Sequence, residues 1–152
     1  MEKIIYISGK AITIQIQRQW YSVNDCSLNK NKLYVFGDNL KRVGMAGQAS
    51  IRNIYNAVGL ATKKAPSNEE SAFFTDNELQ LNIDYIQRDI NNIFDLLVTR
   101  SQLDTLVFPL AGLGTGLSKL PTKAPKTFVE LSKMLEIDFG VKTNPQTYEF
   151  YL

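Results

Sequence analysis

The chain has 152 residues, of which 44% are hydrophobic and 21% are charged, and its formal net charge at pH 7 is +2. That length predicts one domain over residues 1–152 with a single buried core, and the weak positive charge makes nucleic acid an unfavoured partner. The chain has one cysteine, Cys26, and no histidine. This excludes an intrachain disulfide, zinc sites built from Cys and His, and acid–base catalysis by histidine.

Strands and helices alternate along the chain. The predicted strands are residues 4–7, 11–16, 33–36, 56–64, 105–110 and 148–152, and the predicted helices start after Gly47 and span residues 79–100 and 122–139. Residues 79–100 carry one apolar stripe, from Ile83 to Leu97, at intervals of three and four. This alternation predicts an α/β fold with helices on both faces of the sheet.

Several shorter segments have their own predictions. Trp20 and Tyr21 lie either in the core or at its rim, with the core favoured. Residues 24–32 are polar and predicted to form a surface loop. Residues 73–75 are predicted to form either a strand or a loop that reaches back to the ligand site proposed below. Thr122 is predicted to cap the last helix, with a proline in its first turn.

The only thiol and the chain's apolar runs bear on chemistry and location. Cys26 stands in a polar stretch with no histidine to activate it, so we expect a surface or half-buried thiol and no nucleophile. The first apolar run is too short for a signal peptide, and no segment approaches the roughly 18 apolar residues of a membrane span. We therefore expect a cytoplasmic protein, in the host cytoplasm if it is viral, with no metal, cofactor or membrane partner.

Two glycine-containing loops follow predicted strands, one over residues 37–50 and one over residues 111–119. Glycine lets the backbone approach a ligand closely, and the N–H groups of such a loop can line a phosphate. The spacing matches neither the dinucleotide-binding fingerprint nor the P-loop. Because ligands of α/β proteins bind at the carboxyl ends of strands, the two loops are predicted to form one cleft. The glycines alone are equally consistent with a plain strand-to-helix connection.

Together these segments resemble the macro domain family, which binds ADP-ribose on an α/β/α fold. Gly114-Thr-Gly-Leu-Ser-Lys-Leu-Pro121 resembles that family's second loop, Leu33-Tyr-Val-Phe-Gly-Asp-Asn39 resembles its strand ending in a ribose-binding Asn, and Gly44-Met-Ala-Gly-Gln-Ala49 resembles its first loop. Most of the chain is also similar to small macro-like proteins of phages and bacteria. The resemblance implies a three-layer α/β/α fold with a mixed, mostly parallel central sheet, and an ADP-ribose-type ligand.

The chain departs from the family pattern at several positions. Lys10 stands where the resemblance places the family's adenine-binding Asp, and Ser118 and Leu120 replace two aromatic residues of the second loop. Ala46 and Ser50 stand where the hydrolase branch has an Asp and a His. The resemblance therefore implies binding more directly than it implies hydrolysis.

The glycine pattern and the resemblance together give a candidate site. The predicted ligand-binding residues are Gly37, Asn39, Gly44, Met45, Gly47, Gln48, Ala111, Gly112, Leu113, Gly114, Thr115, Gly116 and Leu117. The predicted catalytic residues, which would orient a water molecule, are Asp38, Asn39 and Asp76.

Each polar candidate has a structural alternative. Asn39 would either hydrogen-bond a ribose hydroxyl or form an Asx turn. Asp38 would either face the cleft or cap the loop, and Asp76 would either face the cleft or cap the next helix. Other polar residues near the loops are Lys41 and Arg42, expected to be solvated, Thr62 and Lys63, which would point into the cleft, and Lys119 and Lys123, expected to be solvated.

Three functions remain open on this basis. The chain would be a module that binds ADP-ribose or a related nucleotide, an enzyme that hydrolyses an ADP-ribose derivative at the same site, or a non-catalytic phage or bacterial accessory protein. The accessory protein, for example in counter-defence, would sequester a nucleotide signal or bind a protein partner. A carboxylate lining the cleft favours the enzyme, and a closed or apolar cleft favours the accessory protein.

Overall fold

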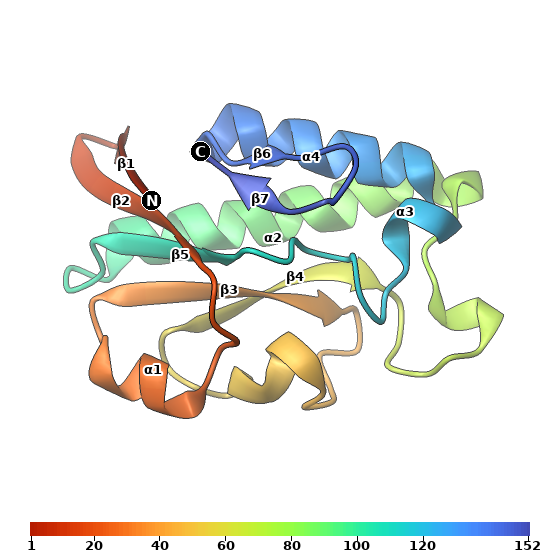
Figure 1. Cartoon of the computed structure of the whole chain (residues 1–152), viewed down its shortest axis with the longest axis horizontal. Helices are drawn as coiled ribbons and strands as arrows, with labels where there is room; N and C mark the ends of the chain where they lie inside the picture. Colours follow the sequence, from red (N-terminus) through yellow and green to blue (C-terminus); the bar gives the residue numbers. More distant parts are fainter.

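The computed structural model covers residues 1–152 and has an α/β fold with a mixed, mostly parallel sheet (Figure 1). The strands are β1 (Glu2–Ile7), β2 (Lys10–Gln17), β3 (Lys32–Asn39), β4 (Ala57–Lys63), β5 (Thr105–Pro109), β6 (Lys142–Thr143) and β7 (Phe150–Tyr151). The α-helices are α1 (Val23–Leu28), α2 (Leu79–Thr99), α3 (Leu120–Lys123) and α4 (Pro125–Phe139), and single 3₁₀ turns form η1 (Gly47–Ile51), η2 (Glu70–Ala72) and η3 (Asp76–Glu78).

The main sheet has the strand order β1-β2-β5-β3-β4. Strand β1 is antiparallel to β2, whereas β2, β5, β3 and β4 are parallel to one another. The carboxyl ends of four neighbouring strands therefore lie at one edge of the sheet. The loops that follow β2, β3, β4 and β5 all leave from this edge.

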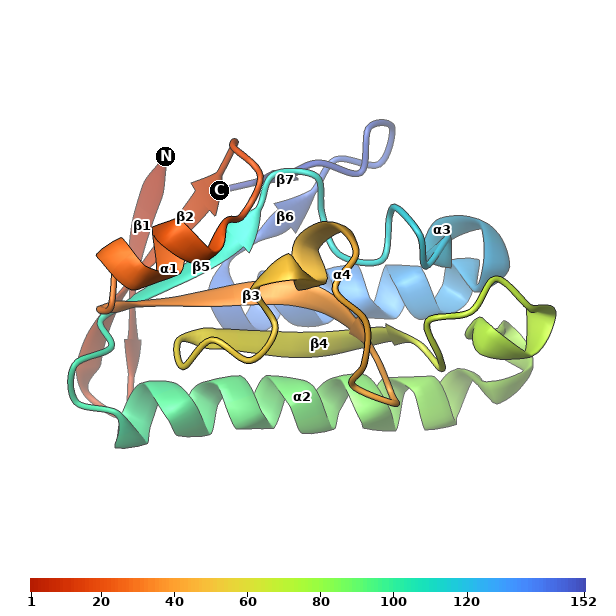
Figure 2. The same cartoon turned by 90° about the horizontal axis from the view of Figure 1, so that it is seen from below.

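Side chains alternate between the two faces of the sheet and fill two separate apolar clusters. On β3, Leu33 and Val35 belong to a core cluster of 24 buried residues that includes residues of α2 and α4. Tyr34 and Phe36 point the other way, into a cluster of seven buried residues that α1 and η1 cover. Figures 1 and 2 show α2 and α4 on one side of the strands and α1 with η1 on the other.

The chain connections diverge between β3 and β5. After β3 the chain passes through η1, on the face that carries the smaller cluster, whereas after β5 it passes to α4 on the opposite face. In parallel sheets a crevice forms where neighbouring connections separate in this way. The two glycine loops lie at this point, as predicted.

Two predictions near the first helix are wrong. Residues 24–32 contain a helix, α1, because Ser22 and Asp25 form a reciprocal capping box at its start. Cys26 on this helix is fully buried in the smaller cluster, where burial, with a further contribution from Asp25, raises its pKa to about 11. The thiol is therefore neither at the surface nor half-buried.

The favoured core position is also wrong for Trp20, whereas it is confirmed for Tyr21. Tyr21 is buried and its hydroxyl donates to the carbonyl of Val107 at 3.1 Å. Trp20 is 74% exposed. Adjacent residues in extended chain point in opposite directions, so only one of the two aromatic rings can enter the core.

Later elements agree with the prediction in type but differ in extent. The long helix is confirmed as α2, but the helix expected after Gly47 is only the short turn η1, with Asn53 following it in a left-handed conformation (φ +73°). Thr122 lies within α3 and caps nothing, because α4 begins at Pro125. The C-terminal strand pairs with β6 in a separate two-stranded sheet. No helix in the structure combines the length and apolar character that a membrane crossing requires.

Candidate functional site

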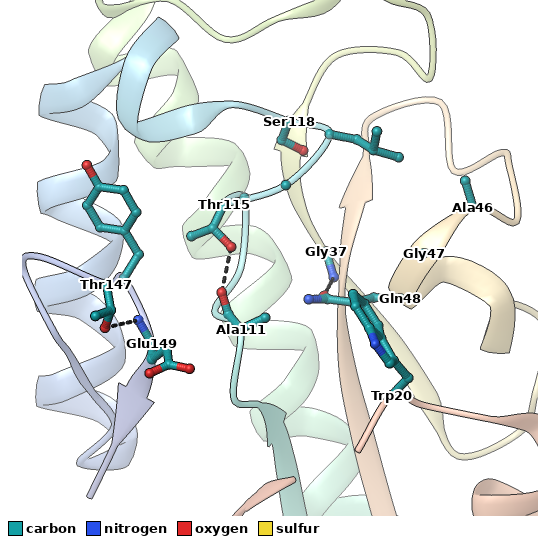
Figure 3. A pocket seen from close by; sticks show the side chains of 14 residues that line it. Trp20, Gly37, Ala46, Gly47, Gln48, Ala111, Thr115, Ser118, Thr147 and Glu149 are labelled. Carbon is teal, nitrogen blue, oxygen red and sulfur yellow. Dashed lines mark hydrogen bonds between the residues drawn. The ribbon is translucent and has the colours of Figure 1, made fainter. Parts of the chain in front are cut away.

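A cavity of about 590 Å³ opens at the carboxyl edge of the sheet, between the loops that follow β2, β3 and β5 and the loop before β7 (Figure 3). Its lining residues are Trp20, Gly37, Ala46, Gly47, Gln48, Ala111, Gly114, Thr115, Gly116, Leu117, Ser118, Thr147, Tyr148 and Glu149. The two glycine loops therefore do meet in one cavity. Most of the predicted ligand residues line it, but Asn39, Gly44, Met45, Gly112 and Leu113 do not.

The loop after β5 leaves its backbone donors free. From Leu113 to Ser118, six consecutive N–H groups form no hydrogen bond with any other group of the protein. The carbonyls of Gly114 and Gly116 are used, because they accept from Leu120 and Lys119 and close the turn into α3. Buried N–H groups without a partner are uncommon in proteins, and Leu113 and Gly114 are buried.

Three glycines shape this loop in different ways. Gly112 (φ +86°) and Gly114 (φ +76°) have left-handed conformations, and a Cβ atom at Gly112 would lie 2.7 Å from the carbonyl oxygen of Tyr148. A Cβ atom at Gly116 would meet nothing within 4 Å. Gly112 and Gly114 are therefore required by the loop's own path, whereas Gly116 leaves space on the cavity side.

Gln48 joins the two loops. Its Oε1 accepts from the N–H of Gly37 and its Nε2 donates to the carbonyl of Gly112, both at 2.9 Å. Figure 3 shows its side chain lying across the space between these two segments, beside Trp20. Since both ends of the amide are already bonded, Gln48 sets the width of the cavity more than it offers bonds to a ligand.

The structure corrects the prediction that Asp38 faces the cavity. The Asp38 carboxylate is 3% exposed and forms ion pairs with Arg52 and Arg42. Arg42 also pairs with Asp89 at 2.6 Å. The carboxylate lies against Gly59 of β4, where even a Cβ atom would be only 2.2 Å from Asp38 Oδ2. Asp38 is therefore part of an internal ion network.

The same network holds the loop after β3. Arg52 donates through Nε to the carbonyl of Gly44 at 2.7 Å and also contacts the carbonyl of Val43. Because Arg52 binds both Asp38 and the loop backbone, residues 43–44 are tied to the end of β3. The loop is braced from behind, away from the cavity.

Asn39 takes the structural role of the two predicted for it, the Asx turn. Its Oδ1 accepts from the N–H of Lys41 at 3.1 Å and its Nδ2 donates to the carbonyl of Val43 at 2.8 Å. This is an Asx turn with an added brace to the loop. Asn39 is 7% exposed and does not line the cavity, so the prediction of a ribose contact is not supported by its position.

Asp76 caps a helix, although not the one expected. Its carboxylate accepts from the N–H groups of Lys126 and Thr127 and from the Thr127 hydroxyl, at 2.9 to 3.0 Å. These residues form the first turn of α4. Burial raises the pKa of Asp76, but the hydrogen bonds from Lys126 and Thr127 outweigh that effect and bring the pKa below its ordinary value. The carboxylate does not face the cavity, which corrects its predicted catalytic role.

Lys10 lies at the opposite end of the sheet. Its Nζ donates to the carbonyls of Leu97 and Arg100, at 2.8 and 3.1 Å, and so caps the C-terminus of α2. Because β2 runs away from this point toward the cavity, Lys10 is separated from the cavity by the length of the strand. Lys10 therefore does not line the cavity.

Six lining residues were not in the predicted set. Two of them, Ala46 and Ser118, belong to the glycine loops, and the others come from two places outside these loops. Trp20 follows β2, and Thr147, Tyr148 and Glu149 precede β7. The segment before β7 is anchored by the N–H of Phe150, which donates to the carbonyl of Leu110 at 2.9 Å. No local motif marks these residues, because their place depends on how the C-terminal segment packs against the loop after β5.

Glu149 is the only carboxylate among the lining residues. It forms no ion pair, and its side chain is drawn in the cavity beside Thr147 in Figure 3. Elsewhere in the chain no group of three or more Cys, Asp or Glu side chains lies close enough to hold a metal ion. A carboxylate lining the cavity is the feature that favours an enzyme over a non-catalytic protein.

Comparison with known families returned one match, over residues 16–134, to a family described as a family of unknown function (DUF7831). The chain belongs to this family. The match includes both glycine loops and most of the main sheet, and it ends before the segment that contributes Glu149. No curated protein and no solved structure matched the chain.

Proposed function

We propose that this protein binds ADP-ribose or a related nucleotide, with the ligand's phosphate groups on the backbone of residues 113–118. The observation that carries the proposal is the run of six consecutive N–H groups in this loop that have no partner within the protein. Successive free N–H groups form a concave site of positive potential, for which phosphate oxygens are suitable acceptors. The glycines at 112 and 114 keep this backbone in the required conformation.

The remainder of the cavity fits a ligand of this size. A volume of about 590 Å³ lies within the range of roughly 300–1,000 Å³ that is usual for small-molecule sites. Trp20 offers an exposed aromatic ring on the wall opposite the loop, and a nucleobase would stack on such a ring. We infer that the helices on the two faces of the sheet make a three-layer, macro-like fold around this site.

Hydrolysis of the bound ligand is the second candidate function, and Glu149 is the observation that favours it. With Asp38, Asn39 and Asp76 engaged elsewhere, Glu149 is the carboxylate that would orient a water molecule in the cavity. The loop N–H groups would stabilise negative charge that develops on a phosphate oxygen. An accessory protein that sequesters a nucleotide signal would use the same cavity and would differ in having no turnover.

The binding proposal is tested by titrating ADP-ribose into the wild type, Gly116→Glu and the uncharged, equally large Gly116→Gln. Because a Cβ atom at 116 meets nothing within 4 Å and residue 116 lines the open cavity, neither variant should unfold the protein. Trp20 is the only tryptophan, so its fluorescence reports binding in the cavity, and calorimetry gives the affinity. We expect binding to the wild type, a modest loss for the glutamine variant and no detectable binding for the glutamate variant.

A wild type that binds neither ADP-ribose nor ADP would contradict the proposal. Equal losses in the two Gly116 variants would mean that bulk alone is responsible and that no phosphate lies near this residue. If binding is found, Glu149→Gln separates the two functions. An enzyme would lose turnover of an ADP-ribose derivative while keeping affinity, whereas a binding protein would show no turnover in either form.

A further inference from the structure

Basic side chains from three segments gather around Phe73, beside the loop and outside the cavity lining. The Nζ atoms of Lys63, Lys123 and Lys119 lie 4.7, 5.0 and 5.9 Å from the centre of the Phe73 ring. Phe73 is buried, and its backbone bridges to Lys63 at the end of β4. Three ammonium groups therefore lie near one ring, one from β4, one from the end of the loop and one from α3.

Lys63 has no partner of opposite charge. Only 4% of the residue is exposed, yet its amino group forms no ion pair and no hydrogen bond. The amino group itself is not enclosed, because the only fully enclosed side-chain polar atoms without a partner are Asn82 Oδ1 and Thr143 Oγ1. The stem of Lys63 is thus packed within the protein while its ammonium group reaches the surface next to Phe73.

Neighbouring lysines of the same region are partnered. Lys123 pairs with Glu70 at 2.8 Å, and Lys64 pairs with Glu78. Lys119, like Lys63, forms no ion pair, and burial together with the charge of Lys119 lowers the pKa of Lys63. Nearly buried lysines normally have a counter-charge, and contact with an aromatic face offsets only part of the cost of desolvation. An anion bound by the two unpaired ammonium groups would supply the negative charge that the protein does not provide there.

This pair of lysines is continuous with the loop whose N–H groups are free. Lys119 directly follows Ser118, and the Ser118 hydroxyl lies 2.8 Å from the hydroxyl of Thr62, the residue before Lys63. We propose that Lys63 and Lys119, beside Phe73, form a second anion subsite at the α3 end of the loop. Resting on the proposed function, this subsite identifies the ligand class as a nucleotide that carries a second phosphate group, separate from the one on residues 113–118.

The test is a titration of the whole protein with inorganic phosphate, followed by NMR of the backbone amides and of the lysine side chains. We expect two groups of signals to move, the amides of residues 113–118 and the signals of Lys63, Lys119 and Phe73. Lys63→Met keeps the packed stem and removes the charge. It should therefore weaken phosphate binding, as followed by the signals of Lys119 and Phe73, by about tenfold. Lys63→Arg should retain binding, and Lys133→Gln, an exposed lysine on α4, is the control for the change in net charge.

The outcomes separate this inference from the proposed function. Movement of the loop amides alone, unchanged in Lys63→Met, would overturn the second subsite and leave the proposed function standing. Movement of the lysine signals alone, lost in Lys63→Met and kept in Lys63→Arg, would support the subsite and contradict phosphate binding by the loop. An equal loss in Lys133→Gln would mean that net charge is responsible and would overturn the subsite.

Discussion

The two glycine loops follow neighbouring parallel strands, but side chains hold them in different ways. The loop after β3 is braced by Arg52, which joins the Asp38 carboxylate to the carbonyl of Gly44. The loop after β5 has no ion pair behind it, and its backbone contact with a side chain from outside the loop is the bond from Gln48 Nε2 to the carbonyl of Gly112. Both loops contain N–H groups that form no hydrogen bond within the protein, from Leu113 to Ser118 after β5 and from Val43 to Ala46 after β3. The difference teaches that neither glycine content nor free N–H groups alone identify a ligand loop. The loop after β5 is distinguished because residues 114–118 line the cavity, whereas residues 43–45 do not.

The largest expected effect comes from breaking the brace of the first loop. Asp38→Asn keeps the shape of the side chain but leaves Arg52, whose side chain is 10% exposed, without its full counter-charge. We expect a loss of about 3 kcal/mol in the free energy of unfolding, measured by urea denaturation. Asp84→Asn, at an exposed position of α2, is the control and should change little. Equal stability of the two variants would contradict the assignment of Asp38 to the ion network.

In the loop after β5, stability should depend on which glycine is replaced. Gly112→Ala places a Cβ atom 2.7 Å from the carbonyl oxygen of Tyr148 at φ +86°, and should cost about 2 kcal/mol of stability. Gly116→Ala meets nothing within 4 Å and should change stability by less than about 0.5 kcal/mol. Thermal unfolding of both variants checks this. A larger loss of stability in Gly116→Ala than in Gly112→Ala would contradict the described path of the loop.

The contact between the loops gives a smaller effect. Gln48→Leu removes the bonds to the N–H of Gly37 and the carbonyl of Gly112, which should lower the free energy of unfolding by about 1 to 2 kcal/mol. Because the cavity would lose its fixed width, ADP-ribose affinity should fall as well. A variant that loses stability but binds ADP-ribose as well as the wild type would show that Gln48 does not set the cavity's width.

The change at Asp76 should have the smallest effect. It shows how much stability a carboxylate contributes when it accepts from backbone N–H groups. The carboxylate accepts hydrogen bonds from the N–H groups of Lys126 and Thr127. Asp76→Ala should therefore lower the free energy of unfolding by about 1 kcal/mol. Because the folded-state pKa is lowered from 3.8, this stabilisation is present above that pH and is lost as the pH falls through the folded-state pKa. Urea denaturation at neutral and acid pH should show the difference between wild type and variant disappear in acid. A difference that persists in acid would contradict this role of the carboxylate.

The fold could be predicted largely because its signals are local. The alternation of Ile12, Ile14 and Ile16 and the stripe along residues 79–100 each identify an element from nearby residues, and β2 and α2 confirm them. The helix α1 was missed because its signal is the pair Ser22 and Asp25, which also fits a polar loop.

The candidate site could be predicted only in part. The glycine segments identified residues such as Gly47, Thr115 and Gly116, which line the cavity. The carboxylates were assigned wrongly, since nothing local shows that Asp38 meets Arg52 or that Asp76 meets α4. Glu149 and Trp20 depend on packing between distant segments, and such contacts have no signature in a single sequence.

The most direct test of the central claim is the change in backbone amide chemical shifts when ADP-ribose is added to the isotopically labelled protein. Direct bonding of phosphate to the loop should move the amide signals of residues 113–118 most, with smaller changes at residues 43–44, which the Arg52 network holds. Saturable binding that moves amide signals elsewhere and leaves those of residues 113–118 in place would contradict the claim that these N–H groups hold the ligand's phosphates.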